Sequence, residues 1–290
     1  MTASDPTEQL AQRNRLAAAL RKLRMAADLS THELATRMGL SQSKVSRLEN
    51  AKKVPSRSEL EAWVEAAGAT AQDLAELLEL ADRALTELTT WREVVHGGHV
   101  RNQQAVADLE TTAATIHTFH PVIIPGLLQT AEYARQVFLS GDFPTRPGPT
   151  DVAAVVAARV ERQAILYDQG KRFEFVTTEA ALRQRFGPVE ATLAQLDRIT
   201  SIATLPNISV GIIPLNAEVT TWRYHGFVIY DDRSDDQDPL VVVTTLSGSI
   251  EVTDPDYVAA YREAFSRLEQ AAVFESAARA LIAQIGTELR

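Results

Sequence analysis

The feature that most constrains the fold is the segment of residues 30–57, STHELATRMGLSQSKVSRLENAKKVPSR. Ser30 and Glu33 have the spacing of a capping box, in which each side chain accepts a hydrogen bond from the other residue's backbone N–H at a helix start. Gly39 can end that helix with a positive φ angle. Ser41 is a favourable cap for a second helix. The segment therefore predicts two short helices joined by a tight turn, which is a helix-turn-helix.

The second of these helices carries different residue types on its two faces. Val45 and Leu48 are predicted to point inward. The other positions are mostly amides, hydroxyls and cations, namely Gln42, Ser43, Lys44, Ser46 and Arg47. Such a face suits the major groove of DNA, where base edges offer donors and acceptors between flanking phosphates. The alternative interpretation is a helical hairpin inside an ordinary bundle.

Charge is distributed unevenly along the chain. The formal net charge is −9, which by itself argues against a nucleic-acid partner. Residues 9–57, however, hold eleven Lys or Arg against three Asp or Glu, so this segment carries +8 and the remainder −17. A basic module on an acidic body is typical of a small DNA-binding head. We also expect the acidic body to repel DNA and thereby to orient the approach of the head.

Length and composition limit the remaining possibilities. A chain of 290 residues predicts two domains. It contains no cysteine, which excludes disulfides, thiolate metal sites and a catalytic thiol. The N-terminus lacks the pattern of a signal segment, and no apolar run approaches the ~20 residues of a membrane span. We therefore expect a cytoplasmic, nucleoid-associated protein without a membrane partner.

Helix signals predict an all-α head of five helices, assigned as a helix-turn-helix domain to residues 7–69. A fourth helix is expected to begin near Ser58, where Ser58 and Glu61 repeat the S-x-x-E spacing, and to stop at Gly68. A fifth is expected from Thr70 to about Val95. Residues 70–99 are interpreted as a connecting helix and a hinge, because His96-Gly97-Gly98-His99 breaks the helical pattern.

The second domain is assigned to residues 100–290, where helical and strand-like segments alternate. Strands are predicted for segments rich in β-branched and aromatic residues, namely 116–124, 172–178, 208–215, 226–231, 240–246 and 247–254. Helices are predicted at 100–115, 127–139, 151–167 and 189–204, and from Pro255 onward. The last three strands lie close together along the chain, which favours antiparallel hairpins. The predicted fold class is multi-domain, with an all-α five-helix head followed by an α+β domain whose mixed sheet is mainly antiparallel.

Residues 40–56, LSQSKVSRLENAKKVPS, resemble the recognition-helix segment of the Xre-type, lambda-repressor-like regulators. The resemblance implies base contacts by Gln42 and Ser43, with Arg47 one turn further along. Side-chain chemistry agrees, because Gln can pair bidentately with adenine and Arg with guanine, each for roughly 1–3 kcal/mol of discrimination.

Four residues are better placed for phosphates, which position the head without reading the sequence: Ser41, Lys44, Asn50 and Lys52. Glu49 is expected to pair within the head, with Arg47 as its candidate partner. The family commonly carries Gly after Glu-Asn, where this chain has Ala51. Because alanine tolerates a positive φ angle poorly, this residue is a departure from the family pattern that bears on the loop after Asn50 and on the direction of Lys52 and Lys53.

Segments of the second domain resemble a further family. They are residues 125–138, 159–166, 175–187 and 205–215, together with the Asp-Pro-x-x-Val-x-x-Tyr-Arg pattern of residues 254–262. In combination they are similar to the WhiJ-like, antitoxin-like regulators of filamentous actinobacteria. The resemblance implies a transcriptional regulator, often encoded beside a small acidic protein that is a candidate partner of the large domain.

A homodimer on double-stranded DNA is expected, because one head offers too few contacts for tight specific binding. Such heads usually act in pairs on two half-sites of an operator, roughly 34 Å apart. The large acidic domain is the natural place for dimerisation. In this interpretation it also senses a small partner protein or ligand, which changes the spacing of the two heads.

Metal and cofactor sites are not predicted. His96, His99, His117 and His120 suggest a metal site, but no carboxylate or cysteine completes a fixed ligand spacing. The acidic segment 231–238 lacks the Gly and the terminal Glu of a calcium loop, and a solvated hairpin tip is the simpler interpretation.

Four polar residues near predicted strand–helix junctions are candidates for an effector or partner pocket: Arg162, Gln163, Glu179 and Arg183. Salt bridges at helix ends are the alternative explanation. No nucleophile elbow, phosphate loop or H-E-x-x-H helix occurs, so an enzyme is not expected. Two alternatives to the regulator stay open, an antitoxin-like protein that mainly sequesters a small partner and an enzyme tethered to DNA.

Overall fold

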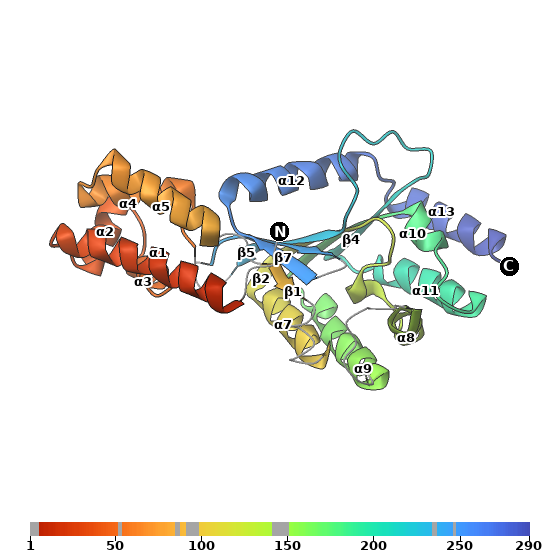
Figure 1. The fold of residues 1–290 in the computed structure, drawn as a ribbon. Coiled ribbons are helices and arrows are strands. Elements are labelled where there is room, and N and C mark those ends of the chain that lie inside the picture. Colours follow the sequence, from red (N-terminus) through yellow and green to blue (C-terminus); the bar gives the residue numbers. More distant parts are fainter. Residues whose placement is uncertain are drawn as a thin grey trace. The chain divides into compact units, whose positions relative to one another are not determined.

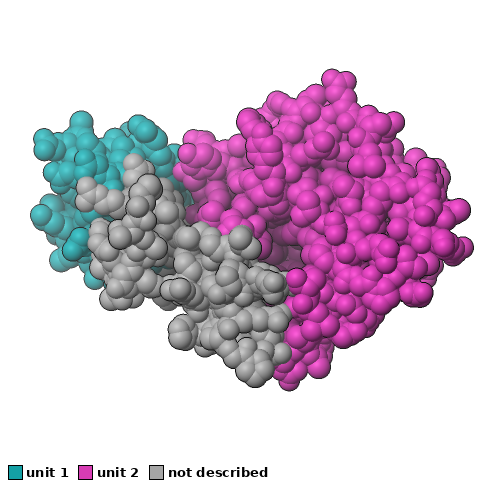
Figure 2. Space-filling model, turned by 45° about the vertical axis from the view of Figure 1, so that its right-hand side comes forward, with its two compact units in different colours: residues 1–87 teal, residues 88–290 magenta. Residues whose placement is uncertain are grey.

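The computed structural model describes residues 6–51, 54–84, 88–90, 99–140, 151–233, 237–245 and 248–290. The chain divides into two compact units, Met1–Glu87 and Leu88–Arg290, which Figure 2 shows in different colours. The division falls inside the segment that was predicted as a connecting helix and hinge. Each unit is built around hydrophobic cores of its own.

Unit 1 is all-α in the residues that the structure describes (Figure 1). Its helices are α1 (Pro6–Ala26), α2 (Thr31–Met38), α3 (Gln42–Glu49), α4 (Arg57–Ala67) and α5 (Ala71–Ala84). Their inner faces share one core that includes Leu20, Leu34, Val45, Leu48 and Trp63. The indole Nε1 of Trp63 is buried and donates a hydrogen bond to the carbonyl oxygen of Leu20 at 3.2 Å. The predicted five-helix head and the inward orientation of Val45 and Leu48 are confirmed.

Two helix boundaries of unit 1 differ from the prediction. The N-cap of α4 is Ser56, which forms its capping box with Glu59, because the sequence holds two overlapping S-x-x-E spacings and the structure uses the earlier one. The fifth helix ends at Ala84 and residues 88–90 form a strand, so the helix expected to reach Val95 is wrong. The glycines of the predicted hinge lie outside the described residues.

Unit 2 is built on a mixed sheet that has seven strands within the described ranges, in the order β1-β7-β6-β5-β2-β3-β4. The strands are β1 (Leu88–Thr90), β2 (Ala113–His120), β3 (Arg172–Thr178), β4 (Ile208–Ile213), β5 (Phe227–Arg233), β6 (Leu240–Thr244) and β7 (Gly248–Val252). β2, β3 and β4 run parallel, whereas the other neighbours pair antiparallel. The predicted class, an α+β domain with a mainly antiparallel mixed sheet, is confirmed.

Helices cover both faces of this sheet (Figure 1). α12 (Pro255–Gln270) lies on one face, where Phe265 and Leu268 pack with Phe119 and Phe227. The other face carries α7 (His99–Thr112), α8 (Ala131–Ser140), α9 (Val152–Arg162), α11 (Val189–Ile202) and α13 (Glu275–Glu288). Short helices complete the unit, namely α10 (Glu179–Arg183) and the 3-10 helices η1 (Gly126–Leu128) and η2 (Gln163–Tyr167).

Strand β2 separates two of the histidines that were considered as metal ligands. It begins at Ala113 and ends at His120, before Pro121, rather than spanning residues 116–124. Side chains alternate between the faces of a strand. The ring of His117 therefore packs edge-on against Phe265 of α12, whereas His120 faces the helices on the opposite side. These two histidines cannot share a metal ion.

Candidate nucleic-acid interface and candidate ligand cavity

The caps of α2 and α3 set the geometry of the helix-turn-helix. The hydroxyl of Ser30 accepts a hydrogen bond from the backbone N–H of Glu33 at 3.1 Å, and the Glu33 carboxylate accepts one from the backbone N–H of Ser30 at 2.8 Å. These bonds lower the pKa of Glu33. α2 ends at Gly39, whose φ angle is 66°, and the hydroxyl of Ser41 caps α3 by accepting from the backbone N–H of Lys44 at 3.2 Å. The predicted caps of both helices are confirmed.

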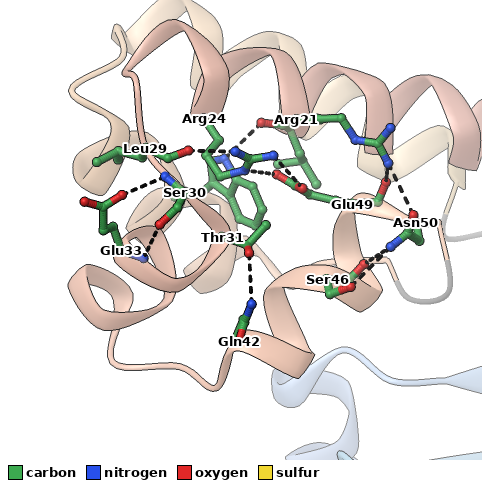
Figure 3. Close-up of polar contacts among 12 residues, drawn as sticks. Arg21, Arg24, Leu29, Ser30, Thr31, Glu33, Gln42, Ser46, Glu49 and Asn50 are labelled. Carbon is green, nitrogen blue, oxygen red and sulfur yellow. Dashed lines mark hydrogen bonds and ion pairs between the residues drawn. The ribbon is translucent and has the colours of Figure 1, made fainter.

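A buried ion pair holds the end of α3 against α1 (Figure 3). Arg24 donates to both carboxylate oxygens of Glu49, at 2.6 and 3.0 Å, and also to the carbonyl oxygen of Leu29 at 2.6 Å. The hydrogen bond with Glu49 raises the pKa of Arg24. The expectation that Arg47 is the partner of Glu49 is wrong. The partner is Arg24 of α1, which is distant in sequence and is brought to Glu49 by the packing of α1 on α3.

The first turn of α3 presents its predicted base-reading residues to solvent. Gln42 and Ser43 are exposed, whereas Arg47 is half-buried. The amide Nε2 of Gln42 donates to the hydroxyl of Thr31 at 3.2 Å, so the first residue of α2 orients the first residue of α3 (Figure 3). Thr31 was not among the predicted site residues. The available signal was its position directly after the N-cap of α2.

The residues predicted to contact phosphates lie in different surroundings. Ser41 is exposed. The ammonium Nζ of Lys44 lies 2.9 Å from the Glu59 carboxylate of α4, and the Lys44 side chain is only 19% exposed. Lys52 lies outside the described residues. Lys44 is therefore engaged within the head in the absence of DNA.

The chain turns away from α3 through Asn50 and Ala51. The side-chain amide of Asn50 donates to the carbonyl oxygen of Ser46 at 2.7 Å, and its Oδ1 accepts from Arg21 at 3.3 Å (Figure 3). Ala51 has a φ angle of 56°, in the left-handed region that favours glycine. The turn thus keeps the conformation that glycine would adopt, although alanine occupies it.

Positive charge follows the first three helices rather than the whole of unit 1. Residues 1–87 hold twelve Lys or Arg and thirteen Asp or Glu, which leaves this unit at −1. Since residues 9–57 carry +8, the acidic residues concentrate in α4 and α5. The half of the head that includes the helix-turn-helix is therefore the electropositive one.

Unit 2 contains a cavity of about 320 Å³ between the sheet and the helices α7, α8 and α9. Most of its lining is apolar and includes Ile116, Ile124, Leu127, Phe138, Phe175 and Val228. Three charged residues also line it, namely Glu110 of α7 and Arg159 and Arg162 of α9. A mostly apolar cavity of this size with a few convergent polar groups is typical of a small-molecule site.

The charged groups of the cavity are strongly perturbed by burial. Arg162 Nε lies 3.2 Å from a Glu110 carboxylate oxygen, and these side chains are 8% and 5% exposed. Burial raises the pKa of Glu110 to about 7 and lowers the pKa of Arg159 to about 9. Burial also lowers the pKa of His120, another lining residue, to about 4, which keeps its ring neutral.

The structure does not bring the four predicted pocket residues together. Arg162 lines the cavity, and the side chain of the adjacent Gln163 donates to the carbonyl oxygen of Gln129 at 2.7 Å. Glu179 and Arg183 instead form an ion pair of 2.7 Å, which Arg183 extends to Glu288 at 2.6 Å.

Arg159, a lining residue of the cavity, was missed. The available signal was its spacing of three residues from Arg162, which places both side chains on one face of a helix.

Two family models match the chain. The model described as a helix-turn-helix domain matches residues 15–78, and the domain of unknown function DUF5753 matches residues 103–284. No curated protein matches the sequence. Among the residues that the structure describes, no helix combines the length and hydropathy needed to span a membrane, and no group of three His, Asp or Glu is arranged to hold a metal ion. The helix-turn-helix match points to a DNA-binding regulator.

Proposed function

Because the chain belongs to the family that carries the domain of unknown function DUF5753, here behind a helix-turn-helix domain, we propose that it is a sequence-specific DNA-binding transcriptional regulator. The observation that carries the proposal is the exposed amide and hydroxyl face of α3, formed by Gln42 and Ser43. Caps and the Arg24–Glu49 pair hold this helix in place. A rigid helix positions its side chains for specific contacts without a further ordering cost.

In this proposal Gln42, Ser43 and Arg47 read base edges in the major groove. The contact between Gln42 and Thr31 supports this role, because it restricts the amide before DNA arrives. Ser41, Lys44, Asn50 and Lys52 are proposed to contact phosphates. For Lys44 this contact requires a phosphate to replace Glu59 as the partner of the ammonium group.

The finer parts of the proposal rest on the sequence resemblances. The head is proposed to be of the Xre type and the second unit to be WhiJ-like. Two chains are then proposed to pair through unit 2 and to bind an operator with two half-sites. Unit 2 is further proposed to sense a small partner protein or ligand, whose binding favours one arrangement of the heads. Neither family description names an enzymatic activity.

The base-reading roles can be tested with DNA selected by the full chain from a random duplex library. We expect a discrete sequence motif, and fluorescence anisotropy should show that Gln42→Ala and Arg47→Ala each lose about 1–3 kcal/mol of affinity and relax the preference at one position. Gln72→Ala, on the exposed start of α5, and Arg135→Ala, on α8, are matched controls. Selection of no motif, or full affinity in the Arg47→Ala variant, would contradict the proposal.

The phosphate role of Lys44 can be tested separately through its partner. Glu59→Gln retains an acceptor for the capping box but removes the carboxylate that holds Lys44. We expect this variant to bind all duplexes more tightly, whereas Lys44→Met should weaken them uniformly and reduce the salt slope by about one. Binding measured from 50 to 300 mM salt would decide the matter, since an unchanged slope in Lys44→Met excludes a phosphate contact.

A further inference from the structure

Two guanidinium groups lie side by side on the wall of the cavity in unit 2. A Cβ atom added at Gly126 would lie 3.1 Å from Nη2 of Arg162 and 3.8 Å from Cζ of Arg159. Both groups therefore reach the same point beside η1, which a side chain at residue 126 would occupy. Burial and the charge of Arg162 both lower the pKa of Arg159, so the two like charges repel each other within a largely buried site.

Positive charge exceeds negative charge at this wall. Glu110 is the carboxylate among the described lining residues, and its oxygen nearest Arg162 makes no hydrogen bond in the described part of the chain, nor does Nε of Arg162. Arg159 contacts neutral groups: it donates to amide oxygens of Gln129 at 2.7 Å and Gln103 at 3.4 Å. Its guanidinium also stacks over Phe138, 4.4 Å from the ring centroid. Among the described residues, Arg159 thus makes no ion pair with a carboxylate of its own.

An excess buried cation is unfavourable unless an anion accompanies it. The cavity has room for such a group, since 320 Å³ corresponds to about ten water molecules at ~30 Å³ each. Beyond the arginines the lining is aliphatic and aromatic, which suits a short apolar chain rather than a sugar or a nucleotide. Guanidinium groups match the planar geometry of a carboxylate.

We propose that this cavity binds an organic monoanion with a short apolar chain, and that Arg159 and Arg162 hold its carboxylate between them. The inference deepens the sensing role of unit 2 and to that extent rests on the proposed function. The binding site itself, however, is independent of DNA. Ligand and DNA can therefore be tested separately on the full chain.

Octanoate, which has ten non-hydrogen atoms, is the probe that we would use in isothermal titration calorimetry. We expect saturable binding with a stoichiometry of one per chain, and weaker binding of 1-octanol and octylammonium. Arg159→Met should raise the dissociation constant of octanoate about tenfold or more. Glu110→Gln should lower it by up to about tenfold, because a competing carboxylate leaves Arg162.

The opposite signs of the two variants separate ligand binding from a structural role. Arg135→Met, an exposed arginine of α8, is the matched control and should bind octanoate as the unmodified chain does. If Arg159→Met does not fold, Arg159→Lys retains the charge and should bind with reduced affinity. Absence of octanoate binding, equal binding of octylammonium, or unchanged affinity in both Arg159→Met and Glu110→Gln would overturn the proposal.

A second measurement links the cavity to DNA. Octanoate should change the affinity of the full chain for its selected duplex, and the change should be absent in Arg159→Met. Octanoate binding without this change overturns the sensing role. Failure to bind any selected duplex in the absence of octanoate contradicts the proposed function of the head instead.

Discussion

At the scale of single residues, Ala51 is one of four non-glycine residues with a positive φ angle in the described part of the chain. Its φ angle of 56° costs an L-residue roughly 1–2 kcal/mol relative to the right-handed region. The turn persists because the C-terminal end of α3 is held by the Arg24–Glu49 pair and by the contact of Asn50 with Ser46. The strain lies directly beside the proposed phosphate contacts.

We therefore expect Ala51→Gly to stabilise unit 1. The free energy gained by relieving the strained φ angle exceeds the entropic cost of the more flexible unfolded glycine. The free energy of unfolding should therefore rise by about 0.5–1 kcal/mol. Urea denaturation of the full chain would measure it. Gly39→Ala is the mirror control, since Gly39 has a φ angle of 66° and no atom within 4 Å of an added Cβ. That variant should lose about 1 kcal/mol, and a less stable Ala51→Gly would contradict the argument.

Single residues are predictable from sequence where their partners are close along the chain. Ser30 with Glu33 and Ser41 with Lys44 follow from spacing, because a helix start brings these groups together whatever the rest of the fold does. The ion pair of Arg24 with Glu49 does not follow from spacing, because this pair forms only where α1 packs against α3.

The contact between the buried charges of the cavity could not be predicted from the sequence either. Glu110 and Arg162 meet through the packing of α7 on α9, which no local pattern encodes.

At the scale of elements, α12 is attached to the sheet by a cluster of charged residues around His117. His117 of β2 lies 2.7 Å from Glu174 of β3 and 3.4 Å from Asp231 of β5. Arg262 of α12 donates to Asp231 at 2.5 Å. Burial lowers the pKa of His117, but hydrogen bonds and charges from Asp231 and Glu174 outweigh this and raise it to about 9. Three strands and one helix thus share one charged contact.

This cluster predicts a dependence of unit 2 stability on pH. The folded pKa of His117, about 9, exceeds its unfolded value of about 6.5. Its contribution is therefore complete below pH 6.5 and is lost as the pH rises toward 9. His117→Gln should be less stable than the unmodified chain by on the order of 1–3 kcal/mol at pH 6, and the difference should shrink at pH 9.5.

Urea unfolding at several pH values, followed by circular dichroism, would measure this difference. His225→Gln, which removes an exposed histidine of the same unit, is the matched control. A difference for His117→Gln that grows with rising pH would contradict the argument. The carboxylates of the cluster depend on pH in the opposite direction. The pKa of Asp231 is lowered to about 2, so its contribution to stability is lost as the pH falls toward that value.

The type of each element, helix or strand, was easier to predict than the order of the strands in the sheet. Caps and apolar periodicity indicate the helices of the head, and β-branched runs indicate most strands. The position of β2 between β3 and β5 could not be predicted from the sequence, since this strand pairing joins residues more than fifty positions apart. The end of β2 at His120 was also missed, because Ile123 and Ile124 continue the apolar pattern past Pro121 while packing under the helices.

At the scale of the whole molecule, the two units have separate cores, and the core residues of unit 1 all lie between Leu16 and Ala81. Unit 1 carries −1 and residues 88–290 carry −8. Most of the repulsion from DNA therefore comes from the part of the chain without the helix-turn-helix. In the proposed function that part offsets its repulsion by pairing two heads on one operator.

We expect the fragment of residues 1–87 to fold cooperatively by itself and to retain the base preference of the full chain. It should bind the selected operator about 10²–10⁴-fold more weakly, because two linked heads profit from a high effective concentration. Anisotropy with one and two half-sites would measure the loss. The fragment with Gln42→Ala and Arg47→Ala is its control. Equal affinity of fragment and full chain would show that unit 2 does not pair the heads.

The burial of Trp63 gives the molecule an optical reporter of its own head. Its indole lies in the centre of unit 1 and donates to the backbone of α1, whereas Trp222 of unit 2 is 71% exposed. The fluorescence of a buried indole has its maximum at a shorter wavelength than that of an indole exposed to water. Replacement of Trp91 and Trp222 by phenylalanine would leave Trp63 as the one tryptophan of the sequence. Selective excitation of its indole could then follow the folding of the head in real time during a DNA or ligand titration.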